Sequence, residues 1–401
     1  MDLLEPLVQP YAWGSRTAIA ELQGRQVPSA GREAELWVGA HPSAPSVVER
    51  SGGRTDLDAV IAADPVGELG AKCADAFGGR LPFLLKVLAA EKALSIQVHP
   101  SREQAEAGFA EENARGVAAG AVVRNYVDDW PKPELLYALT TFEVLGGMRP
   151  PADAAALFEA LAVPELVPLA ADLAAASGPE VLTGVLGRLL NWPLAQRSAL
   201  IAAVVAACAR VAAGDGRYAA ACAATVRIAG DHPGDMGIVA SLLLRHAVLQ
   251  PGESMFMPAG GLHAYLHGTG IELLANSDNV VRAGLTGKHI DVPELLKLTD
   301  PGIGVPLVTA RDLGNGASVY DSPAPEFRLY RVTVGATGVE LPAPGPRLAL
   351  CTEGIVTLTD GAGAALKLAR GESCFLSAAD GRVEAAGPGV VFLAATGLDG
   401  P

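Results

Sequence analysis

The sequence predicts a mainly β protein with a helical insert, and three observations support that fold class. Short strand-like runs separated by glycine and proline make up the chain to about residue 150 and again from about residue 236. Between them, residues 152–228 are rich in alanine and leucine, with apolar residues at helical spacing. A weak internal repeat relates residues 249–258 to residues 368–377. We therefore expect two similar β-barrels and an α-helical domain.

The composition limits the class of protein and of partner. The 401 residues are enough for two or three domains, and 50% of them are hydrophobic, which is typical of globular proteins. The formal net charge of −14 argues against nucleic acid or an anionic membrane as the main partner. A small anionic substrate is still compatible with that charge, because a local cationic pocket can override a negative surface.

Cysteine usage and the apolar segments predict a cytoplasmic protein. Residues 1–15 lack the basic start and apolar core of a signal peptide. The apolar run 200–208 is too short to span a bilayer and is bracketed by Arg197 and Arg210. An odd number of scattered cysteines without metal-binding spacing indicates reduced core thiols. They are Cys73, Cys208, Cys222, Cys351 and Cys374.

Two aromatic motifs come first in the chain. Residues 11–15 (YAWGS) and 33–42 (EAELWVGAHP) are short strand-forming runs with glycine and proline punctuation, which predicts strands and turns. His41 precedes Pro42 and could be a metal ligand. A structural histidine, or one at the edge of a substrate site, is the favoured interpretation.

A pair of donor side chains follows in the predicted strand 94–99. Side chains alternate between the two faces of a strand, so Gln97 and His99 point the same way. Their neighbours Ile96 and Val98 then face the opposite layer. Two such donors on one rigid element can bind one ion; the alternative is a polar pair on a solvated sheet face.

A carboxylate opens the next predicted strand, 135–144. Glu134 alone would most often be a charge at the rim of a sheet, and its importance comes from its combination with other donors. Together with Gln97, His99 and the later His263 it makes a mixed nitrogen and oxygen set that suits zinc or a similar divalent ion. The absence of thiolates argues against a purely structural zinc site.

Residues 152–228 predict an inserted helical domain. Helical spacing of apolar residues is clearest at 153–161, 180–190 and 195–213. This part carries no convincing catalytic cluster. Its alanine richness indicates helix propensity, not a function.

The stretch 249–288 supplies the remaining polar groups. A short strand at 254–258 is followed by Gly260 and Gly261, which break the chain just before His263. A histidine presented at a strand end by a glycine hinge is a common way to build a metal site. The plainer alternative is a histidine with satisfied hydrogen bonds at a turn. Polar and cationic groups follow it: Glu272, Asn276, Ser277, Asp278, Asn279, Arg282 and Lys288.

The C-terminal part returns to short strands. A short helix is expected over 290–300, with Asp291 as its N-cap, and residues 326–400 consist of strand-like runs and glycine-rich turns. In the second copy of the repeat, Arg382 stands where His263 stands in the first. We therefore expect only the first barrel to bind metal.

In this order, the motifs resemble those of the type I mannose-6-phosphate isomerases (phosphomannose isomerases), zinc enzymes of the cupin superfamily. Several independent motifs in order are far more specific than any one of them, and they cover the catalytic part of the family almost end to end. The helical insert and the C-terminal region match less specifically. The matching segments are YAWGS (11–15), ELWVGAHP (35–42), LSIQVHP (94–100), KPE (132–134), GLHAYL (261–266) and SDNVVRAGLT (277–286).

The resemblance implies two cupin-type jelly-roll barrels plus an α-helical domain. The expected division is a discontinuous catalytic cupin domain at 1–150 and 236–320, a helical insert domain at 151–235, and a C-terminal metal-free jelly-roll domain at 321–401.

The resemblance also implies a zinc site and its surroundings. One zinc ion per chain is expected, and its implied ligands are Gln97, His99, Glu134 and His263, the set that the spacing also proposes. Arg282 is implied as an active-site residue. The implied pocket-lining residues are Lys132, Glu272, Tyr265 and Lys288. The candidates for binding the phosphate are Ser95, Lys132 and Lys288.

The implied activity interconverts mannose 6-phosphate and fructose 6-phosphate through an enediol-type intermediate, feeding mannose and GDP-mannose metabolism. A dication stabilises charge on the substrate oxygens, and Arg282 can add to this in a water-poor pocket. A base must remove the C2 proton, and both Glu272 and Lys132 are candidates. The expected partner is a sugar phosphate, with no nucleic-acid or membrane partner and with the chain a monomer or a weak homo-oligomer.

Two positions depart from the family pattern. Pro131 stands where the family often has a histidine proposed for proton transfer, which leaves the base open. Gly287 stands where the family often has a proline, which loosens the loop carrying Lys288.

Two rival functions are a cupin-type iron oxygenase, which two histidines and a carboxylate would suit, and a sugar-phosphate-binding protein without catalysis. Gln97 and the cationic groups count against the first, whereas Pro131 keeps the second open.

Overall fold

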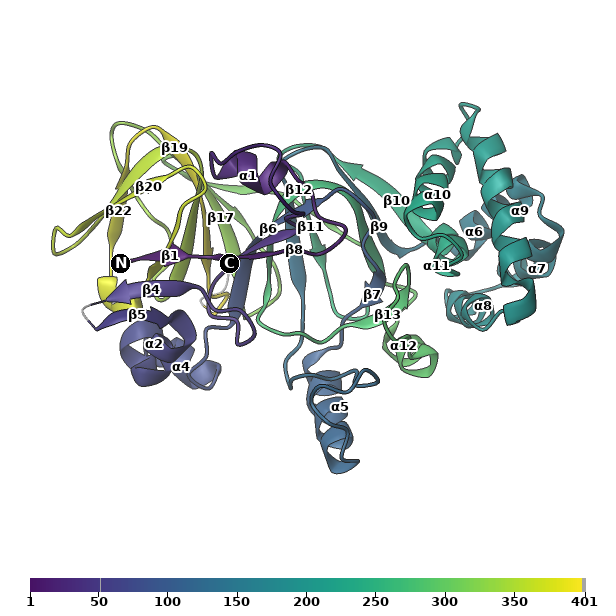
Figure 1. The fold of residues 1–401 in the computed structure, drawn as a ribbon, viewed down its shortest axis with the longest axis horizontal. Coiled ribbons are helices and arrows are strands. Elements are labelled where there is room, and N and C mark those ends of the chain that lie inside the picture. Colours follow the sequence, from purple (N-terminus) through teal and green to yellow (C-terminus); the bar gives the residue numbers. More distant parts are fainter. Residues whose placement is uncertain (51, 399–401) are drawn as a thin grey trace.

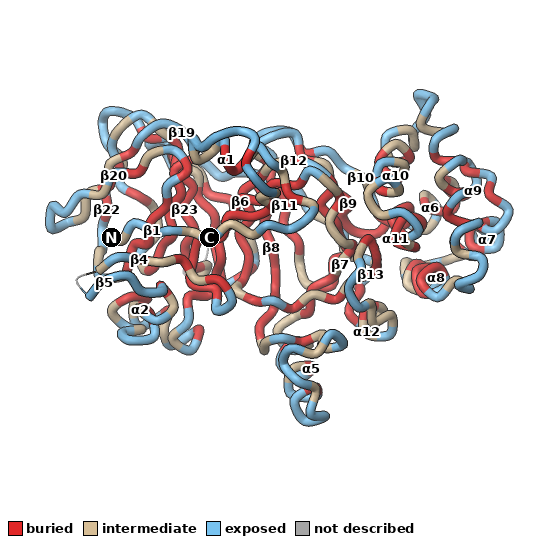
Figure 2. The backbone as a smooth tube through the Cα atoms, in the orientation of Figure 1, coloured by how far each residue is buried: buried red, intermediate tan, exposed pale blue. Residues whose placement is uncertain are grey.

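The computed structural model describes residues 1–50 and 52–398. The molecule is elongated, with two β regions side by side and a group of helices at one end (Figure 1). The strands form two sheets, of 11 and 12 strands. Buried residues run through both β regions, and exposed ones lie mainly on outer loops and helix faces (Figure 2). The mainly β protein with helices predicted from the sequence is confirmed.

The 11-stranded sheet is organised around one long strand, β12 (His263–Ala275). Its first part pairs with β7 (Ile96–Val98) and β9 (Phe142–Met148), and its second part with β6 (Phe83–Ala90) and β8 (Glu134–Ala138). The other strands of this sheet are β2 (Leu7–Gln9), β3 (Glu35–Val38), β10 (Leu244–Leu249), β11 (Ser254–Met257), β13 (Val281–Gly284) and β14 (Leu307–Val308).

A register shift in β12 changes which side chains share a face. The shift lies between Tyr265 and His267. His263 and Glu272 are an odd number of positions apart, so a regular strand would point them to opposite faces. One irregularity between them restores a common face, because an extra residue changes the phase of the alternation. This strand therefore directs both side chains toward one region of the molecule.

The 12-stranded sheet combines C-terminal strands with three N-terminal ones. β1 (Asp2–Glu5) pairs with β21 (Ser373–Leu376) and with β4 (Val47–Arg50), which pairs with β5 (Gly53–Asp56). Strands β1, β4 and β5 thus belong by hydrogen bonding to the C-terminal sheet, and the three-domain division stays a prediction. The other strands are β15 (Arg311–Gly314), β16 (Ala317–Tyr320), β17 (Arg328–Val334), β18 (Val339–Glu340), β19 (Arg347–Asp360), β20 (Ala365–Ala369), β22 (Val383–Ala386) and β23 (Gly389–Ala395).

The strand pairs of the described residues close no ring in either sheet. The two barrels expected from the sequence are therefore observed as two open sheets. In the first sheet the partners of β12 differ on the two sides of its register shift, so the sheet divides there instead of closing. The two copies of the sequence repeat form β11 and β21, each preceded by a Gly-Glu turn. The cupin-type jelly-roll assignment stays a prediction.

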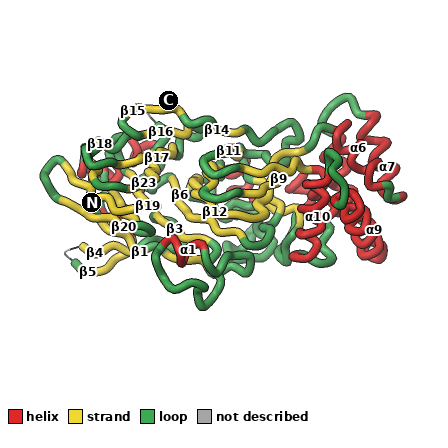
Figure 3. The backbone as a smooth tube through the Cα atoms, turned by 90° about the horizontal axis from the view of Figure 1, so that it is seen from above, coloured by secondary structure: helices red, strands yellow, loops and turns green. Residues whose placement is uncertain are grey.

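The helical region packs against the sheet around β7 and β13. Its apolar residues share one core with Ile96 and Val98 of β7 and with Val281 and Ala283 of β13. Figure 3 shows these helices grouped beyond the strands at one end of the molecule. The three expected helices are confirmed as α6 (Pro151–Leu161), α8 (Val181–Leu190) and α9 (Leu194–Ala212), and the region also contains α7 (Val167–Ala175), α10 (Ala219–Asp231) and α11 (Gly237–Ala240).

Helix α9 is long and apolar enough, by length and composition, to cross a membrane. Its mean hydropathy is 1.5, and 28% of the window is buried inside the protein. The helix packs against α10 and α6. Near its ends, the guanidinium of Arg197 donates to the Trp192 carbonyl and that of Arg210 to the Leu161 carbonyl. These contacts tie α9 into the helical region.

The remaining helices lie outside this group. The expected helix at 290–300 is α12 (Val292–Leu298), and its N-cap Asp291 accepts a hydrogen bond from the Glu294 amide. Helix α5 (Arg102–Ala114) begins with a capping box at Ser101. The short helices are α1 (Ala18–Leu22), α2 (Leu57–Ala63), α3 (Pro65–Leu69) and α4 (Ala71–Ala76), with 3-10 turns η1 (Pro164–Leu166), η2 (Ser241–Leu243) and η3 (Ala378–Asp380).

Candidate metal centre and substrate cavity

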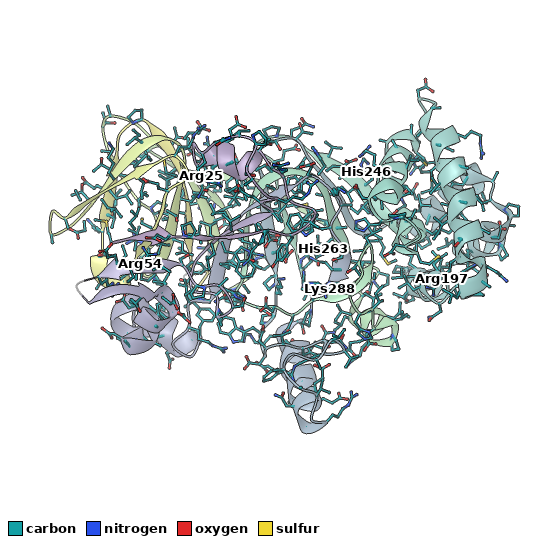
Figure 4. The ribbon with its side chains drawn as sticks, in the orientation of Figure 1. Arg25, Arg54, Arg197, His246, His263 and Lys288 are labelled. Atoms are coloured by element: carbon teal, nitrogen blue, oxygen red, sulfur yellow. The ribbon has the colours of Figure 1, made fainter. Side chains whose placement is uncertain are left out.

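Three predicted ligands meet at one buried point. The ligand atoms of His99, Glu134 and His263 lie within 4.8 Å of one another. His99 Nε2 is 3.2 Å from Glu134 Oε1, and His263 Nε2 is 3.3 Å from Glu134 Oε2. Among the described residues they are the one group of three or more His, Cys, Asp or Glu side chains close enough to hold a metal ion. Figure 4 shows His263 within the 11-stranded sheet region, between the two ends of the molecule.

The fourth predicted ligand lies beside them. The Nε2 atom of Gln97 is 3.3 Å from His263 Nε2, and β7 pairs with β12 at these two residues. Rotation of the Gln97 amide by 180° presents its oxygen to the same point. The sequence predicted that Gln97 and His99 point to the same side of this strand. In the structure that side faces Glu134.

Backbone carbonyls fix the orientation of both imidazoles. His99 Nδ1 is 2.8 Å from the Asn279 carbonyl, and His263 Nδ1 is 3.0 Å from the Gly261 carbonyl. A carbonyl only accepts, so each Nδ1 donates and each Nε2 lone pair points inward, which is the usual arrangement of metal-binding histidines. The buried Nε2 of His99 has no hydrogen-bond partner among the described residues. Two imidazole nitrogens and one carboxylate with inward lone pairs fit a zinc ion.

Burial and the neighbouring groups set the charges of these ligands. Burial lowers the pKa of His99 to about 4, so its imidazole is neutral near pH 7. Burial alone would raise the pKa of Glu134. The neighbouring His99 and His263, together with Lys132, instead hold that pKa well below its usual range. Neutral imidazoles and an ionised carboxylate are the forms that bind a dication.

The local chain explains how these side chains are presented. Glu134 opens β8, and His263 opens β12. Gly260 has a φ of +81°, a conformation that favours glycine, and its amide donates to the carbonyl of His99. The glycine hinge predicted from the sequence thus joins the chain before His263 to the end of β7.

A cavity of about 590 Å³ opens onto this centre. The two histidine ligands do not line it, but the remaining predicted site residues do. These are Ser95, Gln97, Lys132, Glu134, Tyr265, Glu272, Arg282 and Lys288. All the site residues predicted from the sequence, except the two histidines, therefore line one cavity. They lie in different parts of it.

The predicted phosphate ligands occupy two different places. Lys132 Nζ lies 3.7 Å from Glu134 Oε1, beside the metal ligands. The hydroxyl of Ser95 is 3.4 Å from Gln97 Oε1, so it contacts a ligand side chain. Lys288 is exposed and has no carboxylate within ion-pair distance among the described residues, and the half-buried Arg282 likewise has none. Lys92 also lines the cavity and has no carboxylate within ion-pair distance among the described residues, so the free positive charge of the cavity is at Lys92, Arg282 and Lys288.

The sequence analysis did not predict a buried ion-pair network, in which Lys86 lies between Glu35 and Glu272. Lys86 Nζ lies 3.5 Å from both Glu35 Oε2 and Glu272 Oε2. Trp37 Nε1 donates to Glu35 Oε2 at 2.6 Å, and the Lys86 ammonium lies over the Trp37 ring. The detectable signal was a single lysine in the otherwise apolar segment Phe83–Ala90, because an unpaired charge is rarely buried.

Burial raises the pKa of Glu272 to about 7. The charge of Glu134 acts in the same direction, and Lys86 opposes it. The phenol of Tyr265 lies 3.4 Å from Glu134, and burial with these two carboxylates raises the pKa of Tyr265 well above its usual range. A carboxyl group that titrates near neutral pH inside a cavity is suited to accept and return a proton.

His41 lies at the edge of the cavity and outside the metal centre. Its Nε2 is 3.4 Å from Asp278 Oδ1, and its Nδ1 is 2.8 Å from the hydroxyl of Ser43. Both ring nitrogens thus have partners other than a metal. Arg382, which replaces the histidine in the second repeat, is an exposed side chain 3.4 Å from Glu340.

Known proteins match this chain over nearly its whole length. The family "Phosphomannose isomerase type I, catalytic domain" matches residues 1–151. The chain is 37% identical over 392 residues to the mannose-6-phosphate isomerase of Escherichia coli (strain K12), covering 97% of this chain and 98% of that protein. It is 34% identical over 405 residues to the mannose-6-phosphate isomerase of Bos taurus, covering 94% and 93%.

Solved structures of the same group have the same fold as this chain. A mutant of phosphomannose isomerase from Salmonella typhimurium matches with a TM-score of 0.90 and 34% identity over 99% of both chains. A zinc-bound mannose 6-phosphate isomerase matches with a TM-score of 0.89 and 34% identity, covering 98% of this chain and 99% of the other.

Proposed function

The chain belongs to the type I phosphomannose isomerase family, and on this premise we propose that its cavity interconverts mannose 6-phosphate and fructose 6-phosphate. The observation that carries the proposal is a buried His-Glu-His centre beside a cavity lined by three cations, Lys92, Arg282 and Lys288, that have no anionic partner among the described residues. One zinc ion per chain at His99, Glu134 and His263 agrees with the zinc-bound relative. The amide of Gln97 completes this ligand set.

The cavity orients the substrate by charge. Lys288 attracts the phosphate dianion toward the more exposed end, where a phosphate keeps part of its hydration. The sugar carbons C1 and C2 then extend toward the buried centre. When bound, zinc supplies Lewis-acid stabilisation of negative charge on the substrate oxygens.

Of the two candidate bases, the surroundings favour Glu272. Its carboxylate lies in the cavity with a pKa of about 7, so it is half-ionised near neutral pH. Lys132 Nζ instead lies 3.7 Å from Glu134 Oε1, so its contact is with a metal ligand. Glu272 removes the proton from C2 to leave an enediolate, a proton passes from the substrate oxygen O2 to O1, and Glu272 returns its proton to C1 to give the ketose.

Arg282 is placed to act on the charge that develops during this transfer. Strand β13 pairs with β7, and the register sets Arg282 opposite Gln97. The guanidinium keeps its proton and therefore serves as a donor and a cation, not as a base. Beside a ligand of the metal, it stabilises negative charge on the enediolate oxygen.

A coupled assay that follows fructose 6-phosphate formation from mannose 6-phosphate tests the proposal. Activity that disappears on chelation and returns with zinc is expected. A binding protein without catalysis would give no product, which is the rival that Pro131 keeps open. An iron oxygenase would consume oxygen and require iron. The proposal also includes a cytoplasmic location, a role in mannose and GDP-mannose metabolism, and a monomer or weak homo-oligomer.

A further inference from the structure

The backbone between Arg282 and Lys288 is unusual. Gly284, the last residue of β13, has a φ of +150°, Leu285 has a φ of +57°, and the chain then turns through Thr286 toward Lys288. Leu285 is a non-glycine residue in the left-handed region and is 2% exposed. Such a conformation is unfavourable by itself and persists only where surrounding contacts impose it. Something outside this turn must therefore hold it.

A turn of the helical region supplies those contacts. Asp235, between α10 and α11, accepts hydrogen bonds with both carboxylate oxygens. Its Oδ2 accepts from the Thr286 amide at 3.0 Å, and its Oδ1 from the Gly237 amide at 2.7 Å. One side chain thus joins the start of α11 to the segment that leads to Lys288. Helix α11 also contacts β13 directly.

Close backbone packing reinforces this link. A Cβ atom built on Gly237 would lie 2.6 Å from the Leu285 nitrogen, and one on Gly284 would lie 2.6 Å from the Gly237 Cα. Real Cβ atoms do not approach backbone so closely, so both positions require glycine. The two backbones touch at the strained residue, beside the Asp235 hydrogen bonds.

The same turn also contacts another part of the cavity lining. His232 Nε2 is 2.8 Å from the Ala93 carbonyl, and the Ala93 amide donates to Asp231 Oδ2 at 3.4 Å. Ala93, Asp231 and His232 all line the cavity. Residues 231–237 therefore fasten two cavity walls that come from distant parts of the chain.

We propose that Asp235 is a positioning residue for the anion-binding end of the cavity, acting through the Thr286 amide to hold Lys288 where it meets the substrate phosphate. The helical region is then part of the active site, although it supplies no group to the chemistry. The proposal rests on the proposed function, because that function makes the anion a sugar phosphate. Gly287 increases the need for such a device, since glycine does not restrict the loop by itself.

The test compares Asp235→Ala with the wild-type enzyme. The Michaelis constant for mannose 6-phosphate should rise about tenfold, as expected when a hydrogen bond to a charged group no longer orders a binding loop. The rate constant kcat and the zinc content should stay near wild type, because the metal ligands are untouched. Asp312→Ala is the matched control: its carboxylate accepts from the Gly314 amide in a turn of the other sheet. An unchanged Michaelis constant in folded Asp235→Ala overturns the proposal.

Two further variants distinguish a loss of loop positioning from a general loss of protein stability. Adding Gly287→Pro to Asp235→Ala should recover much of the lost affinity, because proline restricts the loop by itself. A Cβ at Gly287 meets nothing within 4 Å, and its amide makes no hydrogen bond among the described residues. Failure of this rescue would show that loop freedom is not the cause. If Asp235→Ala does not fold, Asp235→Asn keeps one acceptor oxygen, and it should show a smaller shift in the same direction.

Titration with inorganic phosphate distinguishes this proposal from the proposed function, because it needs no turnover. Asp235→Ala should bind phosphate about tenfold more weakly than wild type by calorimetry. If wild type fails the isomerase assay but this difference remains, the proposed reaction is wrong and the positioning role stands. Equal phosphate affinity in the two proteins overturns the positioning role.

Discussion

Glu134 joins the metal centre to the rest of the cavity. Its two carboxylate oxygens face different imidazoles, and Lys132 and Tyr265 approach the same group. The imidazoles are oriented in turn by backbone carbonyls that lie outside the ligand set. Because each ligand is held by a second contact, the centre is rigid before a metal arrives, which favours one ion and one geometry.

Replacing a single ligand should therefore release the metal. We expect His99→Ala to lose most of its zinc, with affinity reduced by about 10-fold or more, because both a donor and the geometry are removed. Metal analysis of the purified protein measures this. His246→Ala is the matched control, since His246 pairs with Glu143 away from the centre. Wild-type zinc content in His99→Ala would show that the ligand set is wrong.

The pKa of Glu272 gives the reaction a defined pH dependence. The group must be ionised to accept the C2 proton, and burial raises its pKa to about 7. As the pH falls below about 7, the carboxyl becomes protonated, so kcat/KM should decrease about tenfold per pH unit. The metal ligand His99 stays neutral until the pH nears its own pKa of about 4, so protonation of His99 does not explain this decrease in kcat/KM.

Substitution at the same position tests the assignment of the base. Glu272→Gln should lower kcat by about 10²-fold or more while zinc content is retained. The residual activity of this variant should also lose the decrease in kcat/KM that wild type shows below about pH 7. A variant that keeps both the rate and this decrease would transfer the role of base to Lys132.

Strand pairing determines which residues meet at the site, and it also limits what a sequence can reveal. The alternation of side chains along the strand predicted that Gln97 and His99 lie on one side. That prediction needed only three consecutive residues of the sequence. Lys86 has two carboxylate partners only because β6 lies between β3 and β12, which carry Glu35 and Glu272. Such pairing joins segments far apart in the chain, so local periodicity cannot predict it.

Other elements were predictable to different degrees for similar reasons. The longer helices α6, α8 and α9 show clear apolar spacing, and the expected ranges match them closely. Closed barrels were expected, but the irregularity within β12 divides the sheet, and a shift of one residue leaves no local signal. Asp235 was not singled out, because its partner Thr286 is far along the chain.

The pairing of β13 with β7 leads to a prediction for Arg282. Its position opposite Gln97 places the guanidinium near the reacting oxygens, so Arg282→Ala should lower kcat by about 10²-fold with zinc content unchanged. Steady-state kinetics separates this from a phosphate contact, whose loss would mainly raise KM. The control is Arg331→Ala, because Arg331 is a half-buried arginine that donates to the Thr333 hydroxyl in the other sheet. Wild-type values of both constants in Arg282→Ala would remove Arg282 from the active site.

At the scale of the whole molecule, two sheets of similar size carry very different chemistry. The repeat produces β11 in one and β21 in the other, yet all seven histidines of the chain precede residue 290. The second sheet therefore offers no imidazole, and its thiols Cys351 and Cys374 are buried, with pKa values that burial raises to about 11 and about 12. A protonated buried thiol is a poor metal ligand.

The difference between the sheets predicts one zinc ion per chain and a stability that depends on it. Metal binds the assembled triad but has no such site in an unfolded chain, so saturating zinc should stabilise the fold by about 4 kcal/mol at a thousandfold excess over Kd. Chelation should therefore lower Tm and abolish turnover together, and zinc should restore both. Thermal denaturation with and without chelator, combined with a metal count, measures this. Two zinc ions per chain would mean that the second sheet binds metal after all, whereas an unchanged Tm with full activity in metal-free protein would exclude the triad as the site of catalysis.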